Sequence, residues 1–206
     1  MGRYLVTAGP TREALDPVRF LSNRSSGRMG YALAAALHVR GHEVVLISGP
    51  TALEPPPVAV VEQVESAREM LAACEVHWPA CDGVFGVAAV ADFRPKEVSA
   101  SKWKRGEVAE PVIALTPNPD ILGILAASKG ERLACGFAVE TDSPEAHALA
   151  KMRRKGLDYI ALNGPEAQGA AASELLLLGA DGSRRPLGPA PKTELVEALL
   201  AVVLDG

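Results

Sequence analysis

Aromatic residues are scarce in this sequence, where Phe, Trp and Tyr together make up 4% of the 206 residues. Hydrophobic residues nevertheless account for 48% of the chain, and most of them are alanine, leucine and valine. A core with few large rings has to be built from closely layered aliphatic side chains, as when helices pack on a sheet. The composition therefore favours an α/β protein, and the length suits one compact domain with a sizeable core.

Cysteine is also rare, and its three copies show no CxxC spacing. They lie in or beside apolar stretches, which indicates neither a disulfide framework nor a zinc site. We expect them to be small buried side chains. The four histidines share no spacing either, which argues against a histidine-based metal site or a catalytic triad.

Excess positive charge and long apolar runs are missing too. A formal net charge of −4 argues against a general nucleic-acid or membrane-surface binder, because those proteins need surplus Lys and Arg over a broad face. No run approaches the ~20 apolar residues of a membrane span, and the amino-terminal residues lack the three-part pattern of a signal peptide. We therefore expect a soluble cytoplasmic protein. A small anionic ligand stays compatible, since it needs only a local basic cluster.

Strand-like and helix-like segments alternate along the chain, with the ~30-residue rhythm of parallel βαβ units. This pattern predicts a single domain, residues 1–206, with a doubly wound, mainly parallel sheet and helices on both faces. Ligands on such sheets bind beyond the carboxyl ends of the strands, so the loops that follow residues 7, 90, 115, 139 and 162 are expected at one edge. Strands are predicted at 3–7, 43–48, 83–90, 112–115, 133–139 and 159–162, helices at about 27–40, 66–75, 118 onward, 143–156 and 193–204, a loop at 164–172 and a hairpin at about 175–187.

The segment from Thr7 to Gly30 ends in a turn rich in Ser and Gly that leads into a helix. A helix amino terminus presents unpaired N–H groups and a positive dipole, and arginines in the same segment add formal charge. This segment suits a phosphate group. The alternative is that Ser25, Ser26 and Gly27 only cap the helix. The segment is neither a GxGxxG nor a Walker sequence.

A polar, basic stretch from Asp92 to Gly106 interrupts the alternation. Fifteen residues without a strand or helix pattern, inside a compact domain, usually form a functional flap or a disordered insert. Asp92 follows an apolar strand and suits a ribose hydroxyl or a nearby magnesium ion, while Lys102 and Lys104 suit a triphosphate. The alternative for a basic run is a solvated loop.

Two further segments end at the same predicted edge. In TPNPDI, Asn118 is predicted to cap a helix with Pro119 at its first position, and Asp120 lies in the same turn. The GFAVET segment follows at residues 136–141. Each of these segments is also compatible with a purely structural role, as a well-capped helix and as a strand end.

Taken together, these segments resemble phosphopantothenoylcysteine synthetase, the carboxy-terminal half of the bacterial bifunctional coenzyme A enzyme. The resemblance covers about residues 3 to 200 and lies in loop motifs on one predicted edge, which says more about function than fold alone. The motifs are TAGPTRE, DPVRFLSNRSSGRMG, AAVADFRP, SKWKR, NPDIL, GFAVET and KGLDYIALN, in the order and approximate spacing of that family.

The resemblance implies a Rossmann-like fold, a homodimer, CTP as co-substrate and dependence on Mg²⁺. In that family the carboxylate of 4'-phosphopantothenate attacks the α-phosphorus of CTP and releases pyrophosphate. The amine of L-cysteine then displaces CMP from the acyl-cytidylate. The flavin-binding decarboxylase half of the bifunctional enzyme is not in this sequence, so no FMN is expected, and functional pairing with a flavin-dependent decarboxylase is implied.

The family's functional residues can be carried over by motif. Asn23 resembles the residue that acts on the activated acyl group, and Lys102 resembles the first lysine of the family's KxKK motif. Two positions depart from the family pattern: Arg105 ends the basic motif, and Asn163 is followed by Gly164 instead of Asp. The resemblance assigns nucleotide or substrate binding to Gly9, Thr11, Arg19, Arg24, Ser25, Ser26, Gly27, Ala89, Asp92, Phe93, Lys104, Asn118, Asp120 and Phe137, and assigns no metal ligands.

Two other functions remain open at this stage. A nucleotide-binding or regulatory module would keep these loops without turnover, although the joint presence of Asn23, Asp92 and Lys102 argues against it. An NAD-dependent oxidoreductase would share the fold, but its glycine fingerprint is missing.

Overall fold

A computed structural model describes residues 1–104, 112–139, 143–164 and 172–206. In these residues a central sheet of eight strands has the order β12-β11-β10-β9-β6-β1-β4-β5. The six neighbouring strands β10, β9, β6, β1, β4 and β5 run parallel to one another. The remaining two strands, β11 and β12, are each antiparallel to their neighbours. The strands are β1 (Arg3–Ala8), β4 (Glu43–Ser48), β5 (Val60–Gln63), β6 (Gly83–Gly86), β9 (Leu133–Val139), β10 (Tyr159–Asn163), β11 (Ala172–Gly179) and β12 (Arg184–Pro191).

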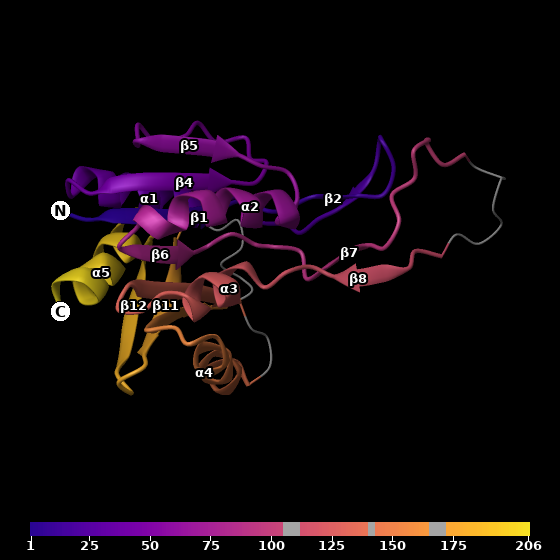
Figure 1. The fold of residues 1–206 in the computed structure, drawn as a ribbon. Helices are drawn as coiled ribbons and strands as arrows, with labels where there is room; N and C mark the ends of the chain where they lie inside the picture. The colour runs from indigo at the N-terminus through magenta and orange to yellow at the C-terminus, as the bar shows by residue number, and fades with distance from the viewer. Residues whose placement is uncertain (105–111, 140–142, 165–171) are drawn as a thin grey trace.

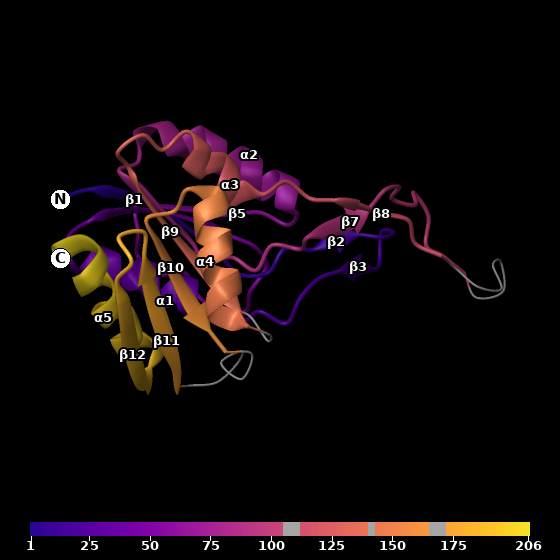
Figure 2. The ribbon, with the colours of Figure 1, turned by 90° about the horizontal axis from the view of Figure 1, so that it is seen from below.

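Helices cover both faces of the sheet (Figures 1 and 2). One face carries α1 (Arg28–Val39) and α5 (Lys192–Asp205), and the other carries α2 (Ala67–His77), α3 (Ile121–Ala127) and α4 (Pro144–Lys155). A short 3-10 turn, η1 (Trp78–Ala80), follows α2. Successive side chains of a strand point to opposite faces, so Leu5 packs in the core on the α2 side and Val6 in the core on the α1 side. Both cores are mainly aliphatic, as the composition predicts.

An arm projects from the edge of the sheet where the parallel strands end (Figure 1). It consists of residues 11–22, 92–104 and 112–117. Within it, β2 (Glu13–Ala14) pairs with β3 (Phe20–Leu21), and β7 (Phe93–Pro95) pairs with β8 (Leu115–Pro117), both antiparallel. Figure 2 confirms from a second direction that these strands and the segments joined to them lead away from the sheet.

The predicted parallel sheet, hairpin and terminal helix are confirmed, and three predicted elements need correction. The strand predicted at 83–90 ends at Gly86, because the N–H groups of the next two residues bond to the Thr7 hydroxyl and not to a neighbouring strand. The strand predicted at 112–115 lies at 115–117 and belongs to the arm, not to the sheet edge. The helix predicted from Asn118 begins at Ile121. The end of the flap at 105–106, the end of GFAVET at 140–141 and most of the loop predicted at 164–172 lie outside the described residues.

The three cysteines, Cys74, Cys81 and Cys135, are free and buried, as their apolar surroundings predict. In the described part of the chain, no helix is both long enough and apolar enough to cross a membrane.

Candidate active site

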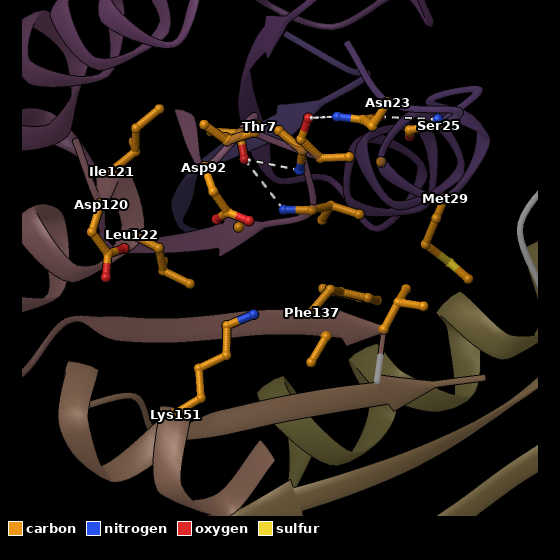
Figure 3. Close-up of a pocket in the computed structure, with 18 of the residues that line it drawn as sticks. Thr7, Asn23, Ser25, Met29, Asp92, Asp120, Ile121, Leu122, Phe137 and Lys151 are labelled. Carbon is orange, nitrogen blue, oxygen red and sulfur yellow. Dashed lines mark hydrogen bonds between the residues drawn. The ribbon is translucent and has the colours of Figure 1, made fainter. Parts of the chain in front are cut away.

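A cleft of about 860 Å³ lies at the carboxyl ends of β1, β6, β9 and β10 (Figure 3). The amino terminus of α1 borders it on one side, and α3 and α4 border it on the other. Of the residues proposed from the sequence, those that line the cleft are Asn23, Ser25, Ser26, Gly27, Ala89, Asp92, Asn118, Asp120 and Phe137. The structure therefore brings together loops that are more than a hundred residues apart in the chain, from Asn23 to Phe137, at the edge that the βαβ pattern predicts.

Two threonine hydroxyls hold the segment that follows β6. Thr7 is buried, and its Oγ1 accepts hydrogen bonds from the N–H groups of Val87 and Ala88 at 3.2 Å each. Thr11 is fully buried, and its Oγ1 accepts from the Ala91 N–H at 2.9 Å. The two threonines thus satisfy three N–H groups of the 87–91 segment, and Ala89 is held between them by a parallel bridge to Pro10. Thr11, proposed as a binding residue, supports the cleft from below and does not line it.

The amino terminus of α1 opens into the cleft with no side-chain cap among the described residues. Gly27 precedes it with φ of 77°, a value that favours glycine. A Cβ on Gly27 would also lie 2.7 Å from the Thr51 methyl and 3.3 Å from the Gly9 Cα. Gly9, proposed as a binding residue, is thus the surface on which the turn packs. The close packing holds the first N–H groups of α1 at the cleft wall, where they suit an anion.

Asn23 is exposed at the same wall and makes two hydrogen bonds within the chain. Its Nδ2 donates to the Ala89 carbonyl, and its Oδ1 accepts from the Ser25 N–H at 3.0 Å. These bonds fix the amide beside the 87–91 segment (Figure 3). Because an amide nitrogen carries two hydrogens and an amide oxygen has two lone pairs, Asn23 retains one donor and one acceptor site for a ligand.

Asp92 lines the cleft at the start of the arm, opposite α4. Its backbone carbonyl accepts from the Asn118 N–H at 2.8 Å, and the Asn118 Nδ2 donates to the Ala91 carbonyl at 2.8 Å. Asn118 therefore joins the two segments that lead into the arm. The prediction that Asn118 caps a helix is wrong, since it lies three residues before α3 and its side chain bonds elsewhere.

Asp120 is the residue that caps α3, with its Oδ1 accepting from the Gly123 N–H at 3.0 Å. The same oxygen accepts from Lys155 Nζ at 2.6 Å. Partial burial acts to raise the pKa of the Asp120 carboxyl, but the bonds from Lys155 and Gly123 outweigh it and lower that pKa. Asp120 is thereby kept ionised and tied to α4, which links two helices that border the cleft.

A basic face of α4 also borders the cleft, and the sequence reasoning missed it. Lys151 reaches from α4 into the space opposite Asp92 and Thr7 (Figure 3). The signal that would have found this face is a stripe at helical spacing, i, i+4 and i+7, on the helix that follows a strand ending at the site. The stripe lies beside the buried face of the helix, where Ala148 and Met152 pack in the core. Its members that line the cleft are His147, Lys151 and Arg154, together with Lys155.

Two more cations and an amide complete the polar lining of the cleft. Arg28 begins α1, Lys192 begins α5, and both line the cleft. Burial, followed by repulsion from Arg28, lowers the pKa of Lys192. Asn163 lines it at the end of β10, and its buried Oδ1 has no hydrogen-bond partner in the described chain. Cations from α1, α4 and α5 thus converge on one cavity, which suits a highly charged anion.

The remaining proposed residues lie outside this cleft, and most belong to the arm. Arg19 is paired with Asp16, and its Nη2 donates to the Trp103 carbonyl at 3.2 Å. None of the described residues 93–104 lines the cleft. Arg105 lies outside the described residues. The exposed side chains that are separate from the cleft are Arg24, Phe93, Lys102 and Lys104.

Among the described residues, no group of three His, Cys, Asp or Glu side chains could hold a metal ion. The carboxylates that line the cleft, Asp92 and Asp120, come from different segments. An arrangement of this kind suits a Mg²⁺ that is held mainly by the phosphates of a bound nucleotide, with one or two carboxylates nearby.

Comparison with known proteins agrees with this geometry. The chain is 39% identical over 218 residues to the coenzyme A biosynthesis bifunctional protein CoaBC of Mycobacterium tuberculosis (strain ATCC 25618 / H37Rv), which covers 98% of this chain and 52% of that protein. It is 45% identical over 162 residues to CoaBC of Escherichia coli (strain K12), covering 77% of this chain and 40% of that protein. The chain thus spans about half the length of the curated relatives it matches.

A solved structure has the same fold over nearly the whole chain. The crystal structure of the C-terminal domain of CoaBC superposes with a TM-score of 0.85 at 40% sequence identity, covering 98% of this chain and 93% of that one. The family described as the DNA/pantothenate metabolism flavoprotein C-terminal domain matches residues 2–205. The cleft, the sheet order and these similarities lead to one conclusion: the chain belongs to the DNA/pantothenate metabolism flavoprotein C-terminal domain family.

Proposed function

We propose that this chain joins 4'-phosphopantothenate to L-cysteine at the expense of CTP, within coenzyme A biosynthesis. The carboxylate oxygen of 4'-phosphopantothenate attacks the α-phosphorus of CTP, and the bond to the β-phosphate breaks to release pyrophosphate. The cysteine amine then attacks the acyl carbon, loses a proton and displaces CMP. The observation that carries this proposal is the meeting, in one cleft, of the open α1 terminus, Asn23, Asp92 and the basic face of α4.

The electrostatics of the cleft suit the leaving group. Pyrophosphate gains negative charge as it departs, and cations already in place stabilise that charge without reorganising. The α1 N–H groups, Arg28 and Lys192 lie on one side, and Lys151 and Arg154 lie on the other. Mg²⁺ bound to the triphosphate would add charge neutralisation, with Asp92 or Asp120 as its protein neighbour. The proposed reaction requires no flavin.

The polar neutral groups suit the acyl part of the reaction. Asn23 is held by Ala89 and Ser25 and keeps a donor and an acceptor site for a ligand. We assign it to the acyl oxygen and the incoming amine, because it carries no charge with which to bind phosphate. We assign the Asp92 carboxylate to a nucleotide hydroxyl or to the triphosphate-bound metal.

A homodimer is part of the proposal, because the flap lysines are remote from the cleft of their own chain. The described flap residues line no part of that cleft, and the arm that carries them leads away from the sheet (Figure 2). The arm also exposes large apolar side chains, which a second copy would cover. They are Val18 (60% exposed), Phe20 (47%), Phe93 (52%), Val98 (58%) and Leu115 (48%). We propose that Lys102 and Lys104 reach the triphosphate bound by the partner.

The test is pyrophosphate release by the purified chain with Mg²⁺, 4'-phosphopantothenate and either CTP or ATP, before and after cysteine is added. Before cysteine is added, we expect rapid pyrophosphate release with CTP and slower release with ATP. We expect 4'-phosphopantothenoylcysteine to form only once cysteine is present. Equal efficiency with ATP would remove the CTP assignment. Nucleotide binding without any pyrophosphate release would support a non-catalytic module, and nicotinamide binding would support an oxidoreductase.

A further inference from the structure

The arm contains a buried carboxylate that the proposed chemistry does not use. The Asp16 side chain is 0% exposed, although it lies on a projecting loop. Its Oδ1 accepts from the N–H groups of Val18 at 2.7 Å and Arg19 at 2.8 Å. Its Oδ2 accepts from the Trp103 N–H at 3.2 Å and from Arg19 Nη1. Four donors therefore surround one carboxylate.

The bonds from Val18 and Arg19 to Asp16 close a local turn, whereas the bond from Trp103 joins two distant segments of the chain. Bonds from Asp16 to residues two and three positions later form an Asx-type turn that needs no other part of the chain. Trp103 is 87 residues away in sequence. Its carbonyl also accepts from Arg19 Nη2 at 3.2 Å, so the Asp16–Arg19 pair binds both backbone polar groups of Trp103.

Binding both backbone groups of Trp103 determines where the flap lysines are placed. The Trp103 N–H belongs to the peptide group that joins it to Lys102, and its carbonyl belongs to the peptide group that joins it to Lys104. Each peptide group is planar and rigid. Fixing these two planes fixes the Cα atoms of both lysines relative to the first loop. A second link, from the Ser99 N–H to the Leu15 carbonyl at 3.0 Å, holds the same two segments together.

The Asp16 carboxyl group is ionised at neutral pH, which strengthens its hydrogen bonds to the flap backbone. Burial acts to raise the pKa of this carboxyl, but the N–H groups of Val18, Trp103 and Arg19 and the Arg19 guanidinium outweigh it and lower the pKa to about 2. Hydrogen bonds to an ionised acceptor are roughly twice as strong as those between neutral groups. The carboxylate therefore stays charged at neutral pH and keeps its hold on the flap backbone.

We propose that Asp16 is a positioning residue, which sets the flap lysines Lys102 and Lys104 for the triphosphate by clamping the backbone of Trp103 between them. This inference rests on the proposed function, in which those lysines act on the nucleotide. Asp16 itself is buried and lines no part of the cleft, so its proposed role is indirect. It links the loop that carries Asn23 to the flap, so both parts are presented in one fixed relation.

The experiment measures pyrophosphate release with CTP, Mg²⁺ and 4'-phosphopantothenate for Asp16→Asn, Lys102→Gln and the double variant. A positional error of about 1 Å can cost ~10²-fold in rate, so we expect Asp16→Asn to lower the rate constant of pyrophosphate release by ~10- to 100-fold. Loss of the lysine should cost ~10²- to 10³-fold. Because both changes affect the contribution of Lys102, the loss in the double variant should be clearly smaller than the product of the two single losses.

Glu13→Gln provides a matched control. Glu13 is 3% exposed, lies in the same loop, and uses its Oε1 to accept from the Ala67 N–H at 3.0 Å, away from the flap. We expect this variant to lower the Tm while pyrophosphate release stays near normal. Trypsin should cut after Lys102 and Lys104 faster in Asp16→Asn than in Glu13→Gln. If Asp16 has only a structural role, trypsin should cut the flap equally fast in Asp16→Asn and Glu13→Gln. The rate loss of the double variant should then equal the product of the losses of Asp16→Asn and Lys102→Gln.

The outcomes separate this inference from the function on which it rests. Normal pyrophosphate release by Lys102→Gln would overturn the role of the flap lysine, and the positioning role of Asp16 with it. An impaired Lys102→Gln beside a normal Asp16→Asn, or fully multiplicative losses, would overturn the Asp16 inference alone. If Asp16→Asn does not fold, Trp103→Pro removes from the flap side the N–H that Asp16 binds, and normal pyrophosphate release by that variant would also contradict the inference.

Discussion

The side chains in the cleft fall into two kinds: some supply charge, and others are neutral groups held in a fixed position by hydrogen bonds. Lys151 and Lys192 carry charge, whereas Asn23 is held at both ends of its amide by the backbone around it. The bonds of Asn23 also order the loop before α1, so the side chain has a structural role beside its proposed chemical one. A substitution there has to separate the two roles.

Asn23→Asp tests the assignment of Asn23 to the second half of the reaction. The carboxylate keeps the size of the side chain but loses the donor to Ala89, and it would repel charge that develops on the acyl oxygen. We expect acyl-cytidylate to accumulate, because cysteine attack suffers more than CTP activation. Pyrophosphate is followed before cysteine is added, and product afterwards.

The control for that variant is Ser22→Ala, which removes a bond from Ser22 Oγ to the Thr11 carbonyl at 2.7 Å in the same loop. It should loosen the loop without changing the balance between the two steps. If Asn23→Asp is folded and passes intermediate to cysteine at the normal rate, Asn23 has only the structural role.

The Asp16 clamp predicts a dependence of stability on pH. The pKa of this carboxyl is about 2 in the folded chain, against an ordinary value of ~3.9 that applies when the chain is unfolded. A group whose folded pKa is depressed contributes stability that is fully present above its unfolded pKa and is lost as the pH falls through its folded pKa. The difference in urea midpoint between wild type and Asp16→Asn should therefore be constant from pH 7 to ~5 and shrink between pH ~4 and ~2. A difference that stays constant down to pH ~2.5 would contradict the assigned pKa.

Helices and strands place the side chains of the cleft, and α4 has one face for packing and another for the cleft. Its buried residues pack on the sheet, and its basic stripe borders the cleft. Because the two sets lie on different faces, the helix can bind an anion without exposing the core. The same helix also presents Arg153 to solvent, away from the cleft.

Lys151→Gln should raise the KM for CTP roughly tenfold, the low end for losing a charge-assisted hydrogen bond at a partly exposed site. Arg153→Gln removes the same charge from the same helix outside the cleft, so its KM should stay within about twofold of wild type. Because salt screens exposed charges, the difference between the two variants should narrow as ionic strength rises. Equal effects would mean that only the net charge of α4 matters.

The predictability of each element follows from its length and periodicity. Buried strands such as β4 and β9 show continuous apolar runs, and α1 shows the helical period, so both kinds are visible in the sequence. The arm strands have only two or three residues, too few for a period to appear. Their pairing depends on contacts such as that of Asp16 with Trp103, which no local pattern encodes.

The same reasoning explains the cleft. The loops after β1 and β6 were predicted because strand ends meet at one edge, and their unusual motifs resemble a known family. The α4 stripe was missed because its residues read as an ordinary solvated basic face. The sequence did not show that Asp120 and not Asn118 caps α3, because both polar residues lie in one turn. The tertiary bond from Asn118 to the Ala91 carbonyl decides between them.

At the scale of the whole molecule, the proposed homodimer would divide the site between two chains, because each arm would serve its partner's cleft. A mixture of two inactive variants tests that arrangement. Lys102→Gln has an intact cleft and a defective flap, and Asn23→Asp has the reverse. If the flap acts on its partner, a mixed dimer contains one site with both parts intact. Random exchange makes half of the dimers mixed, so the activity should recover to about a quarter of the wild-type value in a C₂ dimer.

The corresponding control mixes Lys102→Gln with a Lys104→Gln variant, in which both chains carry flap defects, so no fully intact site can form. Subunit exchange is verified by mass with differently tagged chains. Exchange without recovery in the first mixture would show that each flap serves its own cleft, and a monomer at all concentrations would exclude the dimer altogether.

The burial of the three cysteines has a consequence for the proposed reaction, in which one substrate is itself a thiol. Burial raises the pKa of Cys74 to about 12, and it raises the pKa of Cys81 and Cys135 as well. The thiolate is the form that attacks a disulfide, and attack also requires access. Burial and the raised pKa values therefore disfavour thiol–disulfide exchange between these cysteines and cystine, the oxidised form of the amino acid that the proposed reaction uses.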